Sequence, residues 1–513
     1  MHGGSMSGRA RTAPTAAPHP GGGGEALVTT VLALDAVTTG VRTRAVFDDG
    51  RAAIASYREF TQHFPQPGWV EHDADEIWAA VAATLADVVA RLAGEAIAAI
   101  GITNQRETVV AWDKDSGAPA ARAIVWQDRR TAAACEALAD HLPLVRRTTG
   151  LVLDPYFSGT KARWLIDNAD LPPTGRLALG TIDSWLVWKL TAGAAFVTDP
   201  SNASRTMLFD IGSGRWSPEM CDLLGVPIGA LAEVAPSSAR YGTTSQVPGV
   251  PDGIPISGIA GDQQAALFGQ LCTVPGMSKN TYGTGSFVLL NTGTTCPEPS
   301  EGMLTTVAWD LGDGTLTYAL EGAIFVTGAA VQWLRDGLGI ISASSDIGPL
   351  AESVPDSGGV HVVPAFTGLG SPWWDPWARG TIVGITRGTT RAHIARAVVD
   401  AMVHQTRDAV DAMTRASGVP ISELRVDGGA SAMDAMLQRQ ADELGVRVLR
   451  PSDQETTALG AAYLAGLAEG VWADTAELSS MWTLDAAFEP RADSPSNHAE
   501  WLRAVERSRN WAQ

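Results

Sequence analysis

The sequence predicts an α/β protein made of two similar halves that face a common cleft. Two glycine- and threonine-rich turns carry this prediction: one follows Asp35, and the other is Gly283-Thr284-Gly285. Each turn lies between two short β-like runs, which is the pattern of a β-hairpin. Helical and strand-like segments follow both hairpins, so the two halves resemble copies of one architecture. We place the boundary near residue 270, between domains 26–270 and 271–513.

Length and charge narrow the class of protein. The chain has 513 residues, of which 45% are hydrophobic and 18% charged, which is enough to bury large cores in more than one domain. Its 37 basic and 56 acidic residues leave a net charge of -19, which disfavours binding to nucleic acid. No apolar run reaches the roughly 18 to 20 residues of a spanning helix, so no membrane span is expected.

The N-terminal segment and the cysteines point to the cytoplasm. Residues 1–25 are mainly Gly, Ala, Pro and Thr and lack the apolar core of a signal peptide, so a disordered tail is expected there. The four cysteines are scattered and show no Cys-x-x-Cys spacing, which favours free thiols in a reducing compartment. Oligomeric state is left open, and a homo-oligomer is compatible with the sequence.

The first half begins with a hairpin and continues as an α/β unit. A β-rich run ends at Asp35, and a second run covers Arg42–Phe47, so the turn between them carries an acid. Asp73 begins a run with helical spacing that ends at Gly94. A buried strand, Ile97–Ile102, follows and delivers a group of polar residues at its end, where sites collect in α/β sheets.

The second half repeats this pattern. The predicted elements are a hairpin at Lys279–Asn291, a strand at Leu424–Asp427, a Gly428-Gly429 turn, a helix at Met433–Gly445, a strand at Val446–Leu449 and a helix at Thr456–Leu467.

Three turns could cradle phosphate oxygens. Asp35–Gly40, Tyr282–Gly285 and Asp427–Ala430 each follow a β-like run and are rich in Gly, Thr or Ala, so successive backbone N–H groups are exposed. Taken singly, each is more simply read as an ordinary tight turn. None is a Walker loop, because no Gly-Lys-Ser/Thr follows.

Asp262 is the strongest candidate for acid–base chemistry. It follows a strand-like run, Ile254–Ile259, and lies among small residues that let a ligand approach. The alternative is that it caps the helix beginning at Gln263, and spacing alone does not separate the two. Arg106 and Glu107 could form a surface ion pair, but their place after a buried strand suits a site for a polyhydroxy ligand.

Seven strings in the right order resemble the glycerol kinases of the FGGY carbohydrate kinase family, and the match runs from about Leu27 to about Trp482. They are Gly101-Ile-Thr-Asn-Gln-Arg-Glu107, Ile124-Val-Trp-Gln127, Asp154-Pro-Tyr-Phe-Ser-Gly-Thr-Lys161, Ser201-Asn-Ala-Ser-Arg-Thr-Met-Leu208, Gly258-Ile-Ala-Gly-Asp-Gln-Gln264, Asn280-Thr-Tyr-Gly-Thr-Gly285 and Pro364-Ala-Phe-Thr-Gly-Leu-Gly370.

The resemblance implies two ribonuclease-H-like domains of the actin, hexokinase and Hsp70-ATPase type, with ATP and glycerol in the cleft. It implies ATP-dependent formation of sn-glycerol 3-phosphate, with Asp262 as the catalytic base and Mg²⁺ near Asp35 and Asp262. The implied glycerol-binding residues are Arg106, Glu107, Trp126, Tyr156, Asp262, Gln263 and Phe287. The implied nucleotide-binding positions are Thr38, Thr39, Arg42, Thr284, Gly328, Gln332, Gly429 and Met433.

The chain departs from the family pattern on the nucleotide side. Val37 replaces a glycine of the first phosphate loop, and Met433 stands where the family usually has Asn, which puts the adenine contact in doubt. If the turn requires a positive φ at Val37, strain of about 1 to 3 kcal/mol would lower kcat/KM for ATP. With Val37 at negative φ, Gly40 would absorb the bend and activity would be ordinary.

Two alternatives to a glycerol kinase therefore stay open. One is a related kinase for another polyol, which the intact set of polyol residues disfavours. The other is a glycerol-binding protein with weakened kinase activity, because the departures fall on the nucleotide side alone.

Overall fold

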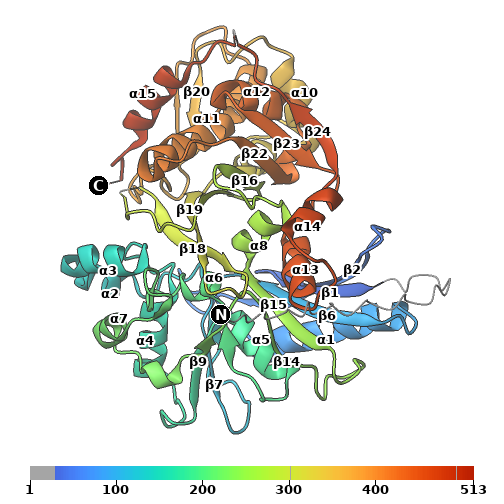
Figure 1. The fold of residues 1–513 in the computed structure, drawn as a ribbon. Helices are drawn as coiled ribbons and strands as arrows, with labels where there is room; N and C mark the ends of the chain where they lie inside the picture. Colours follow the sequence, from blue (N-terminus) through green and yellow to red (C-terminus); the bar gives the residue numbers. More distant parts are fainter. Residues whose placement is uncertain (1–28, 301, 493, 513) are drawn as a thin grey trace, which may run out of the picture.

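The computed structural model describes residues 29–300, 302–492 and 494–512, so the tail predicted at 1–25 lies outside the described residues. Two α/β halves lie one above the other in Figure 1, with helices α8 (Asp262–Gly269) and α13 (Thr456–Ala468) between their sheets. Among the helices of these ranges, none combines the length and the apolar content that a membrane crossing needs.

A six-stranded mixed sheet with the order β14-β15-β6-β1-β2-β3 forms the first half. Its strands are β1 (Thr30–Ala36), β2 (Gly40–Phe47), β3 (Ile54–Glu59), β6 (Ile97–Asn104), β14 (Ser238–Thr243) and β15 (Pro255–Gly261). β1, β2 and β3 are antiparallel, whereas β6 and β15 run parallel to β1. The predicted first hairpin is confirmed, with Asp35 opposite Arg42.

Alternation along β1 explains how both faces of this sheet are covered. Leu32 and Leu34 pack with helices α1 (Ala74–Arg91) and α5 (Ile182–Leu190) on one face. Val31 and Ala33 face α8 and α13 on the other, as the two-residue period of a strand requires. α1 is the helix predicted from the periodic run, and the Asp73 carboxylate caps its first turn.

A seven-stranded sheet with the order β18-β19-β17-β16-β22-β23-β24 forms the second half. Its strands are β16 (Met277–Tyr282), β17 (Ser286–Gly293), β18 (Leu304–Asp310), β19 (Leu316–Ile324), β22 (Glu423–Gly428), β23 (Arg447–Pro451) and β24 (Leu484–Phe488). Helices α11 (Arg391–Ser417) and α12 (Asp434–Leu444) cover its outer face. The predicted second hairpin is β16–β17, and the predicted strand, helix, strand and helix after it are β22, α12, β23 and α13.

Both sheets share one core order, which confirms the duplicated architecture. In each, two antiparallel strands form a hairpin, and a third antiparallel strand pairs with the hairpin's second strand. One parallel strand pairs with the hairpin's first strand, and a second parallel strand follows beside it. This is the ribonuclease-H-like arrangement that the sequence predicts. The boundary near residue 270 stays a prediction, and it separates α8 from α13 although the two helices pack together.

The remaining elements decorate these sheets. The helices are α2 (Ala132–Ala137), α3 (Leu142–Thr149), α4 (Ser158–Asn168), α6 (Pro200–Ala203), α7 (Pro218–Leu224), α9 (Gly328–Gln332), α10 (Ile347–Glu352), α14 (Thr475–Met481) and α15 (His498–Ser508). The short strands are β4 (Gln62–His63), β5 (Glu71–His72), β7 (Val110–Asp113), β8 (Ala123–Ile124), β9 (Leu177–Gly180), β10 (Val197–Thr198), β11 (Phe209–Asp210), β12 (Arg215–Trp216), β13 (Glu233–Val234), β20 (His361–Val363) and β21 (Thr381–Val383).

Glycine allows α13 to lie directly on its neighbours. A Cβ at Gly460 would lie 1.8 Å from the carbonyl oxygen of Ala265 on α8, and a Cβ at Gly101 would lie 2.0 Å from that of Ala461. Neither partner atom can move aside, because both belong to backbone. The approach of α13 to α8 and to the first sheet therefore depends on the absence of a side chain at these positions.

We expect Gly460→Ala to lower the free energy of unfolding by about 1 to 3 kcal/mol, because the methyl group forces α13 away from α8. Denaturant unfolding of the purified variant measures this loss. Gly229→Ala is the matched control, since nothing lies within 4 Å of a Cβ at Gly229. Equal stability of the two variants would contradict the close packing described.

Candidate functional site

The ends of three parallel strands bring the predicted acidic and basic residues together. Asp35 lies near the end of β1, Arg106 follows the end of β6, and Asp262 follows β15 as the first residue of α8. β6 pairs with β1 on one side and β15 on the other, so the three strands end at the same edge of the sheet. Such an edge is where ligands bind in open α/β sheets.

A buried network of alternating charges lies at this edge. Arg106 and Arg205 both donate to Glu321, Arg106 Nη2 at 3.2 Å and Arg205 Nη2 at 2.8 Å from Oε1. Arg205 Nε donates to Glu107 Oε1 at 2.8 Å. All four side chains are at most 2% exposed, so the surface ion pair considered for Arg106 and Glu107 is excluded.

Burial and charge act in opposite directions on the ionisation of this network. Burial favours a neutral Glu321, but Arg106 and Arg205 outweigh it and lower the pKa of Glu321 to about 2. Burial dominates at Glu107 and raises the pKa of its carboxyl despite the same two arginines. The carboxylate of Glu321 is therefore the anion on which both guanidinium groups depend.

Sequence reasoning assigned no role to Arg205 or Glu321. Arg205 lies within one of the strings that carry the family resemblance, and Glu321 lies in β19, whose other central residues are apolar. An acidic residue inside a fully buried strand needs a cationic partner, and this was the available signal. The sequence could not identify this cationic partner, because 215 positions separate Glu321 from Arg106.

Arg106 also contacts the predicted polyol residues. Its Nη2 lies 3.3 Å from the Tyr156 hydroxyl, and its Nε lies 3.2 Å from Asp262 Oδ1. Its guanidinium carbon is 5.9 Å from the centre of the Phe287 ring. The Trp126 and Tyr156 rings meet edge to face at 5.6 Å. The structure thus groups these residues around one guanidinium.

Two buried lysines that the sequence analysis did not predict, Lys161 and Lys279, donate hydrogen bonds to residues of this group. Lys161 is fully buried and donates to the backbone carbonyl oxygens of Tyr156, at 2.7 Å, and Trp126, at 3.5 Å. Burial lowers the pKa of Lys161 to about 7. Lys279, whose pKa burial lowers to about 8, donates to Gln263 Oε1 and leaves the amide nitrogen of Gln263 free to donate elsewhere.

The structure does not make Asp262 the cap of α8, because Gly261 is the N-cap residue and Asp262 is the first residue of the helix. Its Oδ1 accepts a hydrogen bond from the Gln263 backbone N–H at 2.8 Å. Its side chain is nevertheless 28% exposed and contacts Arg106, so a carboxylate oxygen stays accessible at the strand edge. Its role as a general base stays a prediction.

Asp35 is a buried carboxyl with few partners. Burial raises the pKa of Asp35 to about 7, nearby Arg42 opposes this shift, and the charge of Asp262 adds to it. Its Oδ1 is buried and has no hydrogen-bond partner among the described residues. Mg²⁺ is usually held by one or two carboxylates together with phosphate and water, so this pair fits the ion without a third protein ligand.

On the first hairpin, two of the predicted nucleotide-binding residues, Thr38 and Arg42, contact other side chains of the protein. Trp126 Nε1 donates to the Thr38 hydroxyl at 3.0 Å, which joins this hairpin to the aromatic wall. Arg42 forms an exposed ion pair with Glu455, in the loop before α13. Thr39 is exposed beside the turn.

The other predicted nucleotide residues lie at one edge of the second sheet. The backbone N–H of Gly328 donates to the Gly283 carbonyl oxygen, so α9 begins against the turn that contains Thr284. Gly429 is exposed directly after β22, the parallel neighbour of β16. Gln332, at the end of α9, is exposed. Met433 is half-buried next to Gly348 of α10.

The strain expected at Val37 is absent. Val37 is not among the described non-glycine residues with positive φ, and Gly40 also keeps a negative φ. The turn therefore needs no positive φ at either residue. A Cβ at Gly40 would lie 2.6 Å from the Tyr57 hydroxyl and 2.7 Å from the Arg58 carbonyl oxygen, so glycine is needed there for the close approach of β3.

The fold and this strand-edge site define a two-domain kinase of the carbohydrate class, and comparisons with known proteins agree. The chain matches the N-terminal domain of the FGGY family of carbohydrate kinases over residues 30–269 and its C-terminal domain over residues 278–469. The chain belongs to this family.

Individual relatives are similar over nearly the whole chain. A glycerol kinase from Trichlorobacter lovleyi is 56% identical and one from Koribacter versatilis 53% identical, each match covering 94% of this chain and 99% of the relative. A crystal structure of Plasmodium falciparum glycerol kinase with ADP superposes with a TM-score of 0.89 at 33% identity, covering 94% of this chain and 98% of that one. A gluconate kinase from Lactobacillus acidophilus shares the fold, with a TM-score of 0.82 at 20% identity, covering 94% of this chain and 97% of that one.

We expect Glu321→Gln to raise the glycerol KM about tenfold while changing the ATP KM little, because Arg106 loses the anion that orients it. The variant should also lose about 3 kcal/mol of stability, since two buried guanidinium groups lose their shared charge. Steady-state kinetics and denaturant unfolding measure both effects. Glu489→Gln, at an exposed ion pair with Arg447, is the control and should change neither. A Glu321→Gln enzyme with the parental glycerol KM would contradict the positioning role.

Proposed function

We propose that the protein transfers the γ-phosphoryl group of ATP to glycerol and releases sn-glycerol 3-phosphate and ADP. The observation that carries the proposal is the grouping of Arg106, Tyr156 and Asp262 at one strand edge, beside an apolar wall. The high identity to glycerol kinases over 94% of the chain supports the choice of substrate.

The polyol side offers each part of glycerol a complementary surface. Arg106 donates to hydroxyl oxygens, and the Glu107 and Asp262 carboxylates accept from hydroxyl hydrogens. Trp126 and Phe287 cover the carbon chain. Because the network fixes Arg106 before the substrate arrives, little side-chain entropy is lost when glycerol binds.

Asp262 is proposed as the general base. One hydroxyl oxygen of glycerol attacks the γ-phosphorus of ATP, the bond between that phosphorus and the bridging oxygen breaks, and the hydroxyl proton moves to the Asp262 carboxylate. Arg106 Nε, 3.2 Å from Oδ1, holds this carboxylate in place. The Gln263 backbone N–H fixes the same oxygen, so the carboxylate is oriented from two sides.

The nucleotide is proposed to bind between the two hairpins. The turns after Asp35 and around Thr284 present backbone N–H groups and hydroxyls to the phosphates. Gly429 and Met433 border the base. Asp35 and Asp262 would hold Mg²⁺, which would supply positive charge to offset the charge that develops during phosphoryl transfer.

The two alternatives receive less support. The weakened-kinase alternative rested on the departures at Val37 and Met433, and Val37 is not among the described non-glycine residues with positive φ. A kinase for another polyol is disfavoured by the complete set of glycerol residues. The solved structures of gluconate and xylulose kinases are only 20 to 23% identical to this chain, which supports a shared fold and no more.

Asp262→Asn tests the proposed base. We expect kcat to fall by about 10² to 10⁴-fold, because the amide keeps the volume of the carboxyl but cannot accept the proton. Glycerol binding measured by calorimetry should persist. A coupled ADP-release assay follows turnover, with Asp170→Asn, at an exposed position, as the control. Near-parental turnover of Asp262→Asn would show that another group takes the proton.

Val37→Gly tests whether the first hairpin, with valine at position 37, already supports full use of ATP. Because Val37 has an unstrained backbone, we expect kcat/KM for ATP to stay within about twofold of the parent. The same ADP-release assay at saturating glycerol gives this ratio. A rise of about tenfold or more would mean that the isopropyl group hinders the phosphates, and the weakened-kinase alternative would return.

A further inference from the structure

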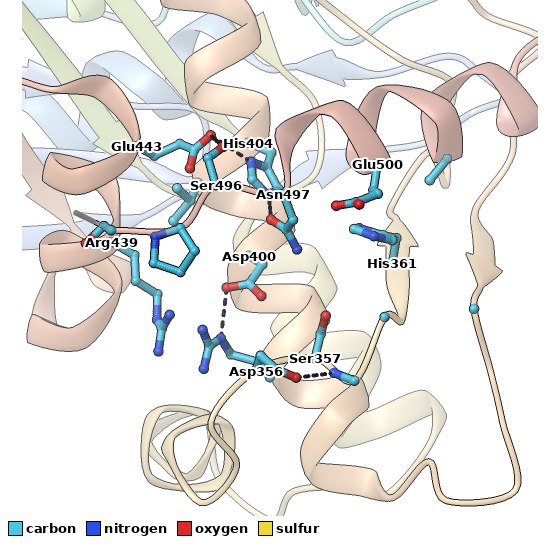
Figure 2. Close-up of a pocket in the computed structure, with 18 of the residues that line it drawn as sticks. Asp356, Ser357, His361, Asp400, His404, Arg439, Glu443, Ser496, Asn497 and Glu500 are labelled. Atoms are coloured by element: carbon cyan, nitrogen blue, oxygen red, sulfur yellow. Dashed lines mark hydrogen bonds and ion pairs between the residues drawn. The ribbon is translucent and has the colours of Figure 1, made fainter. Parts of the chain in front are cut away.

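A large cavity lies on the outer side of the second half, away from the strand edges described above. It has a volume of about 900 Å³ and is enclosed by α11, α12, α15 and the loop before β20 (Figure 2). None of the residues assigned to the polyol or nucleotide sites lines it. Its size is within the range of about 300 to 1,000 Å³ that is typical of small-molecule sites.

Most of the carboxylates in this cavity are already neutralised. Three acidic side chains that line it have an arginine partner, in the pairs Asp400 with Arg396, Asp442 with Arg491, and Glu443 with Arg407. The Asp356 carboxylate accepts from the Gly358 backbone N–H at 2.8 Å. Glu500, on the exposed rim, is the lining carboxylate left without a hydrogen bond among the described residues.

Arg439 is the exception among the deeper cationic groups. It projects from α12, is half-buried, and has no hydrogen bond or ion pair with any described residue. Burial lowers the pKa of its guanidinium, the charge of nearby Arg396 lowers it further, and the carboxylates of Asp400 and Glu352 oppose this shift. Neither carboxylate forms an ion pair with Arg439, whereas Asp400 is paired with Arg396 at 2.9 Å.

Two buried polar side chains face the same space. Ser357 is 2% exposed, and its hydroxyl has no hydrogen-bond partner within the described ranges. His361 is 8% exposed and likewise lacks one. Burial lowers the pKa of His361, so its ring is neutral at pH 7 and offers one N–H donor. Figure 2 shows both side chains around the cavity together with Arg439. The Ser357 hydroxyl is therefore a buried donor without a partner in the described part of the chain, whereas His361 lies near the free carboxylate of Glu500.

We propose that this cavity binds a small phosphate-bearing molecule, with its phosphoryl oxygens between Arg439 and Arg396. Guanidinium groups bind phosphate through paired, charge-assisted hydrogen bonds, and the Ser357 hydroxyl adds a third donor. A protein of net charge -19 repels anions in general, so an anion held here needs a built site of this kind. The remaining volume accommodates the body of the molecule, with Arg503 and Arg507 on the rim.

Calorimetric titration with inorganic phosphate tests the site. Glycerol and a non-hydrolysable ATP analogue are kept saturating, so that the catalytic cleft takes up no phosphate. We expect the parent to bind phosphate with a Kd of about 1 mM, and Arg439→Gln to bind at least about tenfold more weakly. Arg387→Gln, at an exposed arginine outside the cavity, should bind like the parent.

Two further measurements make the result decisive. Arg439→Gln should keep the parental melting temperature, kcat and glycerol KM, because its guanidinium has no partner in the protein and lies outside the cleft. A tungstate soak of crystals of the parent should give an anomalous peak between Arg439 and Arg396. The proposal is overturned if the parent binds no phosphate, if Arg439→Gln binds it equally well, or if acetate binds as tightly as phosphate.

Discussion

The shared ion pair of Glu321 with Arg106 and Arg205 is the interaction on which the rest of the site depends. It joins strand β19 of the second sheet to residues that follow β6 and α6 in the first half. Each arginine has a further carboxylate neighbour, Asp262 for Arg106 and Glu107 for Arg205. Glu321 is the one that accepts hydrogen bonds from both, and its loss would leave two buried guanidinium groups short of negative charge at a cost of several kcal/mol. The position of the polyol residues is therefore set by contact between the two halves and not by one half alone.

Close backbone packing also joins the two halves at this junction. α8 and α13 lie between the sheets, and glycines at positions 101 and 460 bring α13 into direct contact with β6 and α8. Asp262 begins α8, so the proposed base is held by the same packing that joins the halves. A ligand that bridges the two sheets would meet a surface that is already assembled, with the exposed carboxylate oxygen of Asp262 at its centre.

Local patterns in the sequence were sufficient for most of the fold. Both hairpins, the helix after Asp73 and the strand before Arg106 follow from periodicity and turn residues, which act over a few positions. The roles of Arg205 and Glu321 were missed because their pairing is a long-range contact that no local pattern encodes. The expectation of strain at Val37 arose for a related reason. A glycine in the family pattern can serve either a positive φ or the close approach of another segment, and the sequence does not show which. In the structure the close approach is at Gly40.

The most direct test of the account is the identity of the product. Purified protein is incubated with ATP, Mg²⁺ and either glycerol, xylulose or gluconate, and the products are followed by phosphorus NMR. The account predicts rapid formation of sn-glycerol 3-phosphate, with kcat/KM for glycerol at least about a hundredfold above that for the two sugars, because Arg106, Tyr156 and Asp262 fit the smaller polyol. Phosphorylation of xylulose or gluconate at a rate equal to that of glycerol, or no phosphorylation of glycerol, would contradict it.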